Sequence, residues 1–384
     1  MSASEGGARR DVGIVLSGGG VNGVMMELGF LQRLRESVLW PRIGAVFGTS
    51  SGALSGSLAA LDRLDDLEAF LMELQPAMTF RPNRLWQLPF LGLHDYTLPA
   101  TIDAWFGDMT EMARELARAP VELVVVATDL TDDHAHEDEE YELHYSSRTT
   151  PPEEFGQAVL ASAAVSALVM PMRVGDRIAT DGAWVRNFPL GVAYEHPDVE
   201  LIVAFRYLPQ YPKLGVAGLE PLRRRLRRLR RIAFARRVLE EIDQAEERAA
   251  RGEPAHLADT IARLARVSIL RNVRREERMA QQIDLSLREL RALRHDVLAE
   301  IADAKTRAAV EVRFARAQFP FRHDRIVPRV VVRGTVDGVG LEPGIRTQPH
   351  WSDEDKRALI ERGYELADRE LSAITPTLED ASGT

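Results

Sequence analysis

Along the first half of the chain, hydrophobic residues occur in short dense runs that alternate with longer stretches of helical spacing. Residues 12–16 form a continuous apolar run, and residues 43–47, 121–130 and 199–207 are mainly apolar, as is typical of strands buried in a sheet. Between them apolar residues recur every three or four positions, as in residues 25–34, which is the spacing of one helix face. This order of strands and helices predicts an α/β sandwich with a mainly parallel sheet.

The pattern changes after Pro209. Residues 221–318 are rich in Arg and Glu and poor in Gly, so we expect an all-helical insertion there. Beyond it, residues 329–334 predict a strand that returns to the sheet, and residues 351–371 predict a helix with Ser352 as its N-cap. The expected division is a disordered lead (1–10), an α/β core (11–210), a helical insertion (211–320), the last strand and helix of the core (321–375) and a disordered tail (376–384).

Residues 222–237 contain nine arginines and no acidic residue. Helical spacing places Leu222, Leu226, Leu229 and Ala233 on one stripe. A basic amphipathic helix of this kind can lie on an anionic membrane surface. The same pattern fits an arginine-solvated face of a domain helix, so the sequence leaves two interpretations open, peripheral membrane contact or solvation alone.

The chain has 384 residues, of which 45% are hydrophobic and 28% charged, as expected for a globular protein with a sizeable core. Its net charge of −9 argues against a general nucleic-acid binder. It contains no cysteine, which excludes disulfides, thiolate catalysis and cysteine-bound metals. The sequence shows neither an apolar leader nor a run near the ~20 apolar residues of a spanning helix. We therefore expect a cytoplasmic protein, with at most peripheral contact to a membrane.

Residues 43–60 (IGAVFGTSSGALSGSLAA) pass from a strand pattern into a helix pattern through a G-x-S-x-G sequence at residues 48–52. The glycines at its ends allow a sharp turn, which would expose the Ser50 hydroxyl beside the start of a helix. Free N–H groups at a helix N-terminus favour negative charge, as on a serine nucleophile. Because the motif also occurs by chance, an ordinary Gly/Ser turn is the alternative.

A second glycine-rich stretch, residues 17–23, follows the first strand and opens the first helix. Gly18, Gly20 and Gly23 match G-x-G-x-x-G, but the next strand ends without the carboxylate that would hold a ribose. We therefore do not expect a nucleotide cofactor. The preferred interpretation is a set of backbone N–H groups that hold an oxyanion, and a tight structural turn is the alternative.

Residues 131–142 hold seven carboxylates together with His134 and His136. No firm metal-ligand spacing appears among them, and a solvated hairpin loop accounts for the composition. We therefore expect neither a metal nor a cofactor. Residues 81–108, rich in Pro, Trp and Phe, are expected to form an irregular lid or substrate wall, although aromatic stretches also serve plain packing.

Four stretches taken together resemble the patatin-like phospholipases, a family of serine acyl hydrolases. They are the glycine loop (residues 18–23), the serine turn (48–52), residues 161–171, and Asp181-Gly182-Ala183 followed by Asn187-Phe188-Pro189. The resemblance spans residues 12–207 and, less clearly, residues 325–371, whereas the helical region between them shares nothing with it. It implies a patatin-like three-layer sandwich with a mainly parallel sheet.

The resemblance implies a Ser–Asp catalytic dyad, with Ser50 as nucleophile and Asp181 as base. It also implies an oxyanion hole in the loop at Gly18, Gly19 and Gly20. An ordinary Asp, with a pKa near ~3.9, is a poor base for a serine hydroxyl. The site should therefore be partly desolvated, which would raise that pKa and strengthen the hydrogen bond to Ser50.

Two positions depart from the family pattern. Asn22 stands where the family loop usually has Arg or Lys, so a hydrogen-bond donor remains but a charge is missing. Ser166 stands where the family often has proline, which affects only the local backbone. The first departure predicts slow turnover and leaves the fold unaffected.

The sequence thus predicts a lipid acyl hydrolase of phospholipase A or lysophospholipase type, which cleaves carboxylic esters through an acyl-serine intermediate. Its substrate would be a phospholipid or another acyl ester, and no nucleic-acid partner is expected. A soluble esterase or thioesterase acting on smaller acyl groups is one alternative. A pseudoenzyme that binds lipid or a partner through the same cleft is another, and Asn22 keeps it open.

Overall fold

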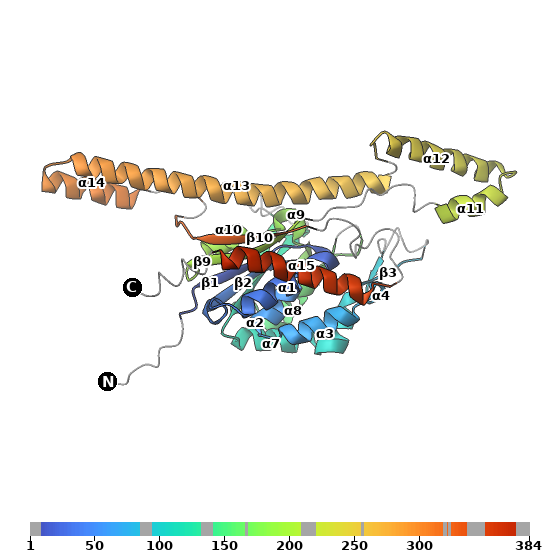
Figure 1. Ribbon diagram of the computed structural model, residues 1–384, viewed down its shortest axis with the longest axis horizontal. Helices are drawn as coiled ribbons and strands as arrows, with labels where there is room; N and C mark the ends of the chain where they lie inside the picture. The colour runs from blue at the N-terminus through green and yellow to red at the C-terminus, as the bar shows by residue number, and fades with distance from the viewer. Residues whose placement is uncertain are drawn as a thin grey trace.

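The computed structural model describes residues 9–84, 94–131, 141–165, 168–208, 220–254, 257–317, 321, 324–335 and 350–373. An α/β body is built on one large sheet, and a long helix lies across it (Figure 1). The expected disordered tail, residues 1–8 of the lead, most of the acidic loop and Ser166 lie outside the described residues.

The sheet is mixed, with a parallel centre and an antiparallel side. Its strands are β1 (Val12–Leu16), β2 (Ile43–Thr49), β5 (Glu122–Asp129), β6 (Glu142–Ser146), β7 (Met172–Val174), β8 (Arg177–Asp181), β9 (Leu201–Tyr207) and β10 (Arg329–Gly334). Their order is β10-β9-β1-β2-β5-β8-β7, with β6 paired to β5. The first five in this order pair in parallel, whereas β6, β7 and β8 are antiparallel to their neighbours. Each of the four predicted strand runs overlaps a strand of the parallel part, and the predicted strand at 329–334 is confirmed as β10.

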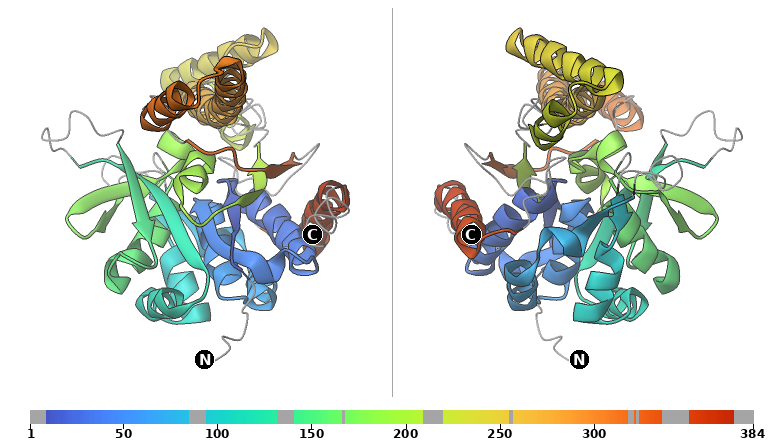
Figure 2. Two further views of the ribbon diagram at one scale, coloured as in Figure 1. Left: turned by 90° about the vertical axis from the view of Figure 1, so that its left-hand side faces the viewer. Right: turned by 90° about the vertical axis from the view of Figure 1, so that its right-hand side faces the viewer.

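Helices cover both faces of this sheet (Figure 2), and a layer of buried hydrophobic side chains lies on each face. The larger layer contains side chains of α1 (Gly20–Arg35), α2 (Ser51–Ala60), α3 (Leu64–Glu73), α7 (Met109–Arg118), α8 (Pro152–Ser162) and α15 (Asp353–Ser372). The smaller layer contains side chains of α10 (Leu190–Glu195) and α13 (Leu257–Glu300). Helices, sheet and helices therefore make the three-layer sandwich that the sequence predicts.

The C-terminal helix α15 is fixed to the body through its contact with α1 (Figure 1). A Cβ on Gly29 would lie 1.9 Å from the Ile360 carbonyl oxygen, and a Cβ on Gly363 would lie 2.0 Å from the Met26 carbonyl oxygen. Only glycine fits at these two points, so the helices approach backbone to backbone. The predicted N-cap is confirmed, since Ser352 Oγ accepts the helix N–H of Asp355 at 3.1 Å.

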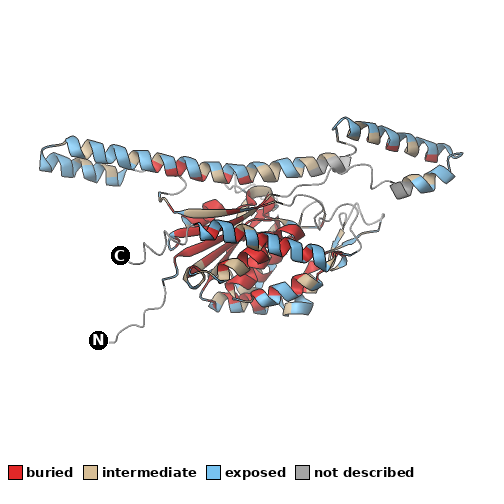
Figure 3. Ribbon diagram, in the orientation of Figure 1, coloured by how far each residue is buried: buried red, intermediate tan, exposed pale blue. Residues whose placement is uncertain are grey.

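The middle of the chain is helical, as predicted. It contains α11 (Glu220–Arg228), α12 (Ala233–Ala250), α13 and α14 (Ala304–Arg316). The 44 residues of α13 span about 66 Å at 1.5 Å per residue. Its middle packs on the sheet through residues such as Val273 and Ala280, while its C-terminal end extends past the body and is largely exposed (Figure 3).

The expectation of one amphipathic helix over residues 222–237 is wrong. Helix α11 ends at Arg228, and α12 begins at Ala233 after a turn in which Ile232 N–H donates to the Leu229 carbonyl at 2.9 Å. Arginines repeat at i and i+4 through this stretch, and such like-charged pairs destabilise a continuous helix. The break turns the basic stretch into a helical hairpin.

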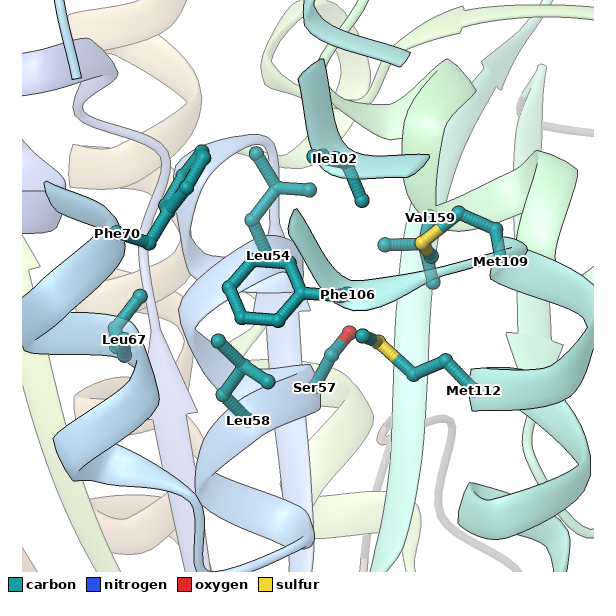
Figure 4. Close-up of a pocket in the computed structure, with 10 residues that line it drawn as sticks. All are labelled: Leu54, Ser57, Leu58, Leu67, Phe70, Ile102, Phe106, Met109, Met112 and Val159. Carbon is teal, nitrogen blue, oxygen red and sulfur yellow. The ribbon is translucent and has the colours of Figure 1, made fainter. Parts of the chain in front are cut away.

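The aromatic-rich segment after α3 is more regular than expected. It contains α4 (Pro76–Thr79), the strand pair β3 (Phe80–Pro82) and β4 (His94–Tyr96), and α6 (Leu98–Phe106), with residues 85–93 outside the described part. Ile102 and Phe106 of α6 line an apolar cavity of about 30 Å³ together with side chains of α2, α3, α7 and α8 (Figure 4). This helix therefore serves mainly to pack the larger hydrophobic layer.

Within the described residues, the helices are all too short or too polar to cross a lipid bilayer.

Candidate active site

Ser50 lies at a sharp turn between β2 and α2, where the sequence predicts it. Its backbone has φ 56° and ψ −122°, a conformation that non-glycine residues adopt only under strain. A Cβ on Gly48 would lie 2.3 Å from the Gly52 carbonyl oxygen, and a Cβ on Gly52 would lie 2.5 Å from that of Leu16. Both glycines are therefore required by close backbone contacts, and the strain at Ser50 is typical of a nucleophile elbow.

Asp181 lies next to Ser50, although 131 positions separate them in the sequence. Ser50 Oγ donates a hydrogen bond to Asp181 Oδ2 at 2.8 Å. The sheet creates this proximity because β5 lies between β2 and β8: Thr49 pairs with Val126, and the next residue, Ala127, pairs with Asp181. The two side chains that the sequence selects as a dyad are thus brought together at one edge of the sheet.

The Asp181 carboxyl group is 2% exposed, and its environment makes it more basic than usual. Desolvation by burial raises its pKa to about 6, while hydrogen bonds from the Ala183 N–H and the Ser50 hydroxyl act in the opposite direction. The Ala183 N–H donates to Oδ1 at 2.8 Å, which leaves Oδ2 directed at Ser50. A carboxylate in this setting can accept a proton from the serine more readily than one in water.

The glycine loop lies beside the elbow. A Cβ on Gly18 would lie 3.0 Å from the Ser50 Cβ. The Gly18 N–H donates to the Asn187 carbonyl at 2.9 Å, and the Gly19 N–H donates to Ser51 Oγ at 2.9 Å. Helix α1 begins at Gly20, which has φ 58°, and the N–H groups of a first helical turn have no intrahelical acceptor. The N–H groups of the first residues of α1, before the Gly23 N–H that donates to the Gly19 carbonyl at 2.9 Å, are thus best placed to receive an anion.

Several further residues support the elbow, and the sequence predicts this role for none of them. Ser162 Oγ accepts the Ser50 N–H at 2.9 Å and donates to the Val126 carbonyl at 2.6 Å. Thr49 Oγ1 donates to the Arg186 carbonyl at 2.9 Å, and the Arg186 guanidinium is 3% exposed. These partners come from distant parts of the chain, so spacing alone could not identify them.

Two further expectations concern other polar residues. Among the histidines that the structure describes, His144 contacts Glu142 and His196 contacts Glu122, and none is hydrogen-bonded to Ser50 or Asp181. Within the described ranges, the acidic and histidine side chains make no cluster that could hold a metal ion. His134 and His136 lie outside those ranges.

Comparison with known proteins adds a family match to this geometry. Residues 14–194 match the family model of patatin-like phospholipases. No curated protein matched the sequence. Among solved structures, VipD from Legionella pneumophila aligns with a TM-score of 0.43 and 14% identity, over 96% of this chain and 68% of its own.

Proposed function

From the match of residues 14–194 to the family model of patatin-like phospholipases, we propose that the protein is a lipid acyl hydrolase of phospholipase A or lysophospholipase type. Members of this family are esterases and lipases. The observation that carries the proposal is the buried hydrogen bond of 2.8 Å between Ser50 Oγ and Asp181 Oδ2 at a strained elbow. A structural serine in an ordinary turn needs neither the strain nor a buried carboxylate partner.

In the proposed reaction, Ser50 Oγ attacks the ester carbonyl while its proton passes to Asp181. Backbone N–H groups of the loop at Gly18, Gly19 and Gly20 stabilise the tetrahedral oxyanion. The C–O bond of the ester then breaks, the alcohol leaves with the proton from Asp181, and an acyl-serine remains. Water, activated by Asp181, attacks the acyl group, and the fatty acid leaves as Ser50 regains its proton.

The N–H groups of the loop can all bind the oxyanion only if the loop changes its internal hydrogen bonds. Gly18 and Gly19 already donate to acceptors within the protein, so the oxyanion would be held first by the N–H groups at the start of α1. The Gly19 N–H can join them only when its bond to Ser51 lengthens. Substrate binding would thus require a small adjustment of the loop against the elbow.

We also propose that the basic hairpin of α11 and α12 makes the peripheral membrane contact. At its turn Leu229, Ile232 and Phe234 are exposed, Phe234 to 73%, beside a series of exposed arginines. Apolar side chains flanked by arginines suit the boundary between lipid headgroups and acyl chains. The hairpin lies at one end of the molecule, away from the sheet (Figure 1). The domain boundaries given above and a cytoplasmic location, with peripheral contact to a membrane, also belong to this proposal.

Two other functions are compatible with the same site. A soluble esterase or thioesterase would use the same dyad on smaller acyl groups. A pseudoenzyme would bind lipid without turning it over, and the uncharged Asn22 in the first turn of α1 favours it. A fluorophosphonate probe separates the two enzymatic functions from the pseudoenzyme because it labels only an activated serine.

The deciding experiment is a hydrolysis screen over phospholipids, lysophospholipids and p-nitrophenyl esters, with Ser50→Ala as the blank. We expect release of fatty acid from lipid substrates and loss of both hydrolysis and probe labelling in Ser50→Ala. Turnover restricted to short soluble esters would favour the esterase. A wild type that is neither active nor labelled would favour the pseudoenzyme.

A further inference from the structure

The long helix α13 contacts the candidate active site through Asn272. Asn272 Nδ2 donates to the Ala183 carbonyl at 2.7 Å, and Oδ1 accepts the Asn187 N–H at 3.3 Å. In an uninterrupted α-helix, the N–H of residue 187 would donate to the carbonyl of residue 183 directly. The Asn272 amide stands between these two groups, where the short helix α9 (Ala183–Arg186) ends, and satisfies both.

Asn187 is in turn bound to the glycine loop. Its Nδ2 donates to the Gly18 carbonyl at 3.0 Å, and its own carbonyl accepts the Gly18 N–H at 2.9 Å. Asn187 is 2% exposed, so these bonds are shielded from water. A continuous series of contacts therefore leads from Asn272 through Asn187 to Gly18, which lies beside Ser50.

One turn further along the same face of α13, Glu276 holds the same segment. It forms an ion pair with Arg186, and its Oε2 accepts the Gly191 N–H at 2.9 Å. The Arg186 carbonyl accepts the hydroxyl of Thr49, the residue before the nucleophile, at 2.9 Å. Residues four apart share a helix face, so Asn272 and Glu276 together attach α13 to the segment between Asp181 and α10.

We propose that Asn272 is a positioning residue for the hydrolytic reaction, and that the helical region outside residues 14–194 completes the active site through it. The inference rests on the proposed function. Asn272 acts on the glycine loop through Asn187 and does not contact the substrate itself. It fixes Asn187, and Asn187 fixes the loop that receives the oxyanion. A misplacement of about 1 Å in such a site can cost ~100-fold in rate. Loosening the contact between Asn272 and Asn187 should therefore lower kcat more than it changes KM.

The test compares Asn272→Ala with Asp284→Asn in the full-length protein. Asp284 lies on the same helix and also attaches it to the body, through its ion pair with Arg329, but it has no bond to the catalytic segment. Both variants should lose stability to a similar degree. We expect Asn272→Ala to lower kcat about 10- to 100-fold on a p-nitrophenyl ester with KM within threefold of wild type, and Asp284→Asn to keep kcat within twofold.

Hydrogen exchange provides a measurement that does not depend on activity. Asn272→Ala should speed amide exchange in residues 17–24 and 182–190, whereas Asp284→Asn should leave these peptides near the wild-type rate. Equal effects of the two variants on kcat and on exchange, or no effect of Asn272→Ala, would overturn the positioning role. If the wild type hydrolyses no ester, the proposed function fails, and the exchange rates still decide whether Asn272 holds the glycine loop.

Discussion

At the scale of single residues, the proposed chemistry of the site depends on how Asp181 is buried. A dyad has no histidine to carry the proton, so the carboxylate itself must be basic enough to take it. Burial provides this by raising the pKa of Asp181 to about 6, because the charged form loses hydration. Oδ2 of this carboxyl group accepts the hydrogen bond of the Ser50 hydroxyl at 2.8 Å.

This pKa predicts the pH dependence of hydrolysis. The base is active only when Asp181 is ionised, so kcat/KM should fall as the pH drops below about 6 and reach a plateau above it. The measurement is kcat/KM on a p-nitrophenyl ester from pH 4.5 to 8.5, with Asp181→Asn as an inactive reference. An acid limb centred near pH 4 would indicate a carboxyl group with an ordinary pKa, and would contradict this account.

Asn22 supports a second prediction at this scale. It is 2% exposed in the first turn of α1, beside the proposed oxyanion site. Asn22→Arg should raise kcat, since a donor in an oxyanion hole is worth ~3 kcal/mol, or roughly a hundredfold. The larger side chain should also overpack a buried position and lower stability by about 1–3 kcal/mol.

The comparison requires kcat for wild type, Asn22→Arg and Asn22→Gln, with Ser50→Ala as the blank. Asn22→Gln enlarges the side chain without adding charge, so it separates packing from electrostatics. A wild type that is already fast, together with a slower Asn22→Arg variant, would show that the loop is adapted to asparagine.

At the scale of helices and strands, α1 and α2 meet around a buried carboxyl group. Glu27 of α1 is 0% exposed; its Oε2 accepts the Ser55 hydroxyl at 2.9 Å, and no partner for its Oε1 is found among the described residues. Desolvation raises the pKa of Glu27 to about 8, against the opposing effect of the Ser55 bond. The group is therefore protonated in the folded protein at neutral pH.

This predicts a loss of stability with rising pH. The folded pKa lies above the unfolded value of 4.5, so the folded state binds more protons between pH 4.5 and about 8. The contribution of Glu27 to the free energy of unfolding is fully present below pH 4.5 and declines as the pH rises through about 8. Glu27→Gln should raise the Tm at pH 8.5 and change it much less at pH 5. An equal shift at both pH values would mean that Glu27 does not titrate as described.

How well the sequence predicts an element depends on what surrounds that element. The strands at 12–16 and 43–49 are buried on both faces, so their residues form unbroken apolar runs. Strands β6 and β8 are partly exposed and carry polar residues, so neither shows such a run. Ser50 and Asp181 could be selected from the sequence as candidates because each lies within a recognisable local pattern. Asn272 could not be selected, because its partners are about 85–90 residues away and its helix has no motif.

At the scale of the whole molecule, the charge is unevenly distributed. The chain has a net charge of −9, yet nine arginines gather in residues 222–237, at one end of the long helical region (Figure 1). Arg223 is committed to ion pairs with Asp243 and Glu246 of α12, which hold the hairpin together. The other eight arginines of the stretch are exposed, and Arg224, Arg227 and Arg228 of α11 are among the cations available to a lipid surface.

The last prediction is that replacing these three exposed arginines with glutamine weakens binding to anionic vesicles. Each basic residue near an anionic surface contributes about 1 kcal/mol, so the triple variant should lose about 3 kcal/mol, roughly a hundredfold in affinity. Binding of the wild type should weaken as salt rises from 0.05 to 0.5 M, because the charges are exposed to screening. The measurement is co-sedimentation with vesicles that contain phosphatidylserine, and vesicles of phosphatidylcholine alone should bind weakly.

The matched control replaces Arg288, Arg291 and Arg313, which are exposed in the other half of the helical region, with glutamine. Both triple variants change the net charge by the same amount, so a general effect of charge would weaken binding equally in the two. Loss of binding only in the hairpin variant would support local docking, in which Leu229, Ile232 and Phe234 enter the headgroup boundary. Co-sedimentation that neither salt nor the hairpin substitutions change would leave the arginines as the solvated face of a helix, and the membrane contact would be wrong.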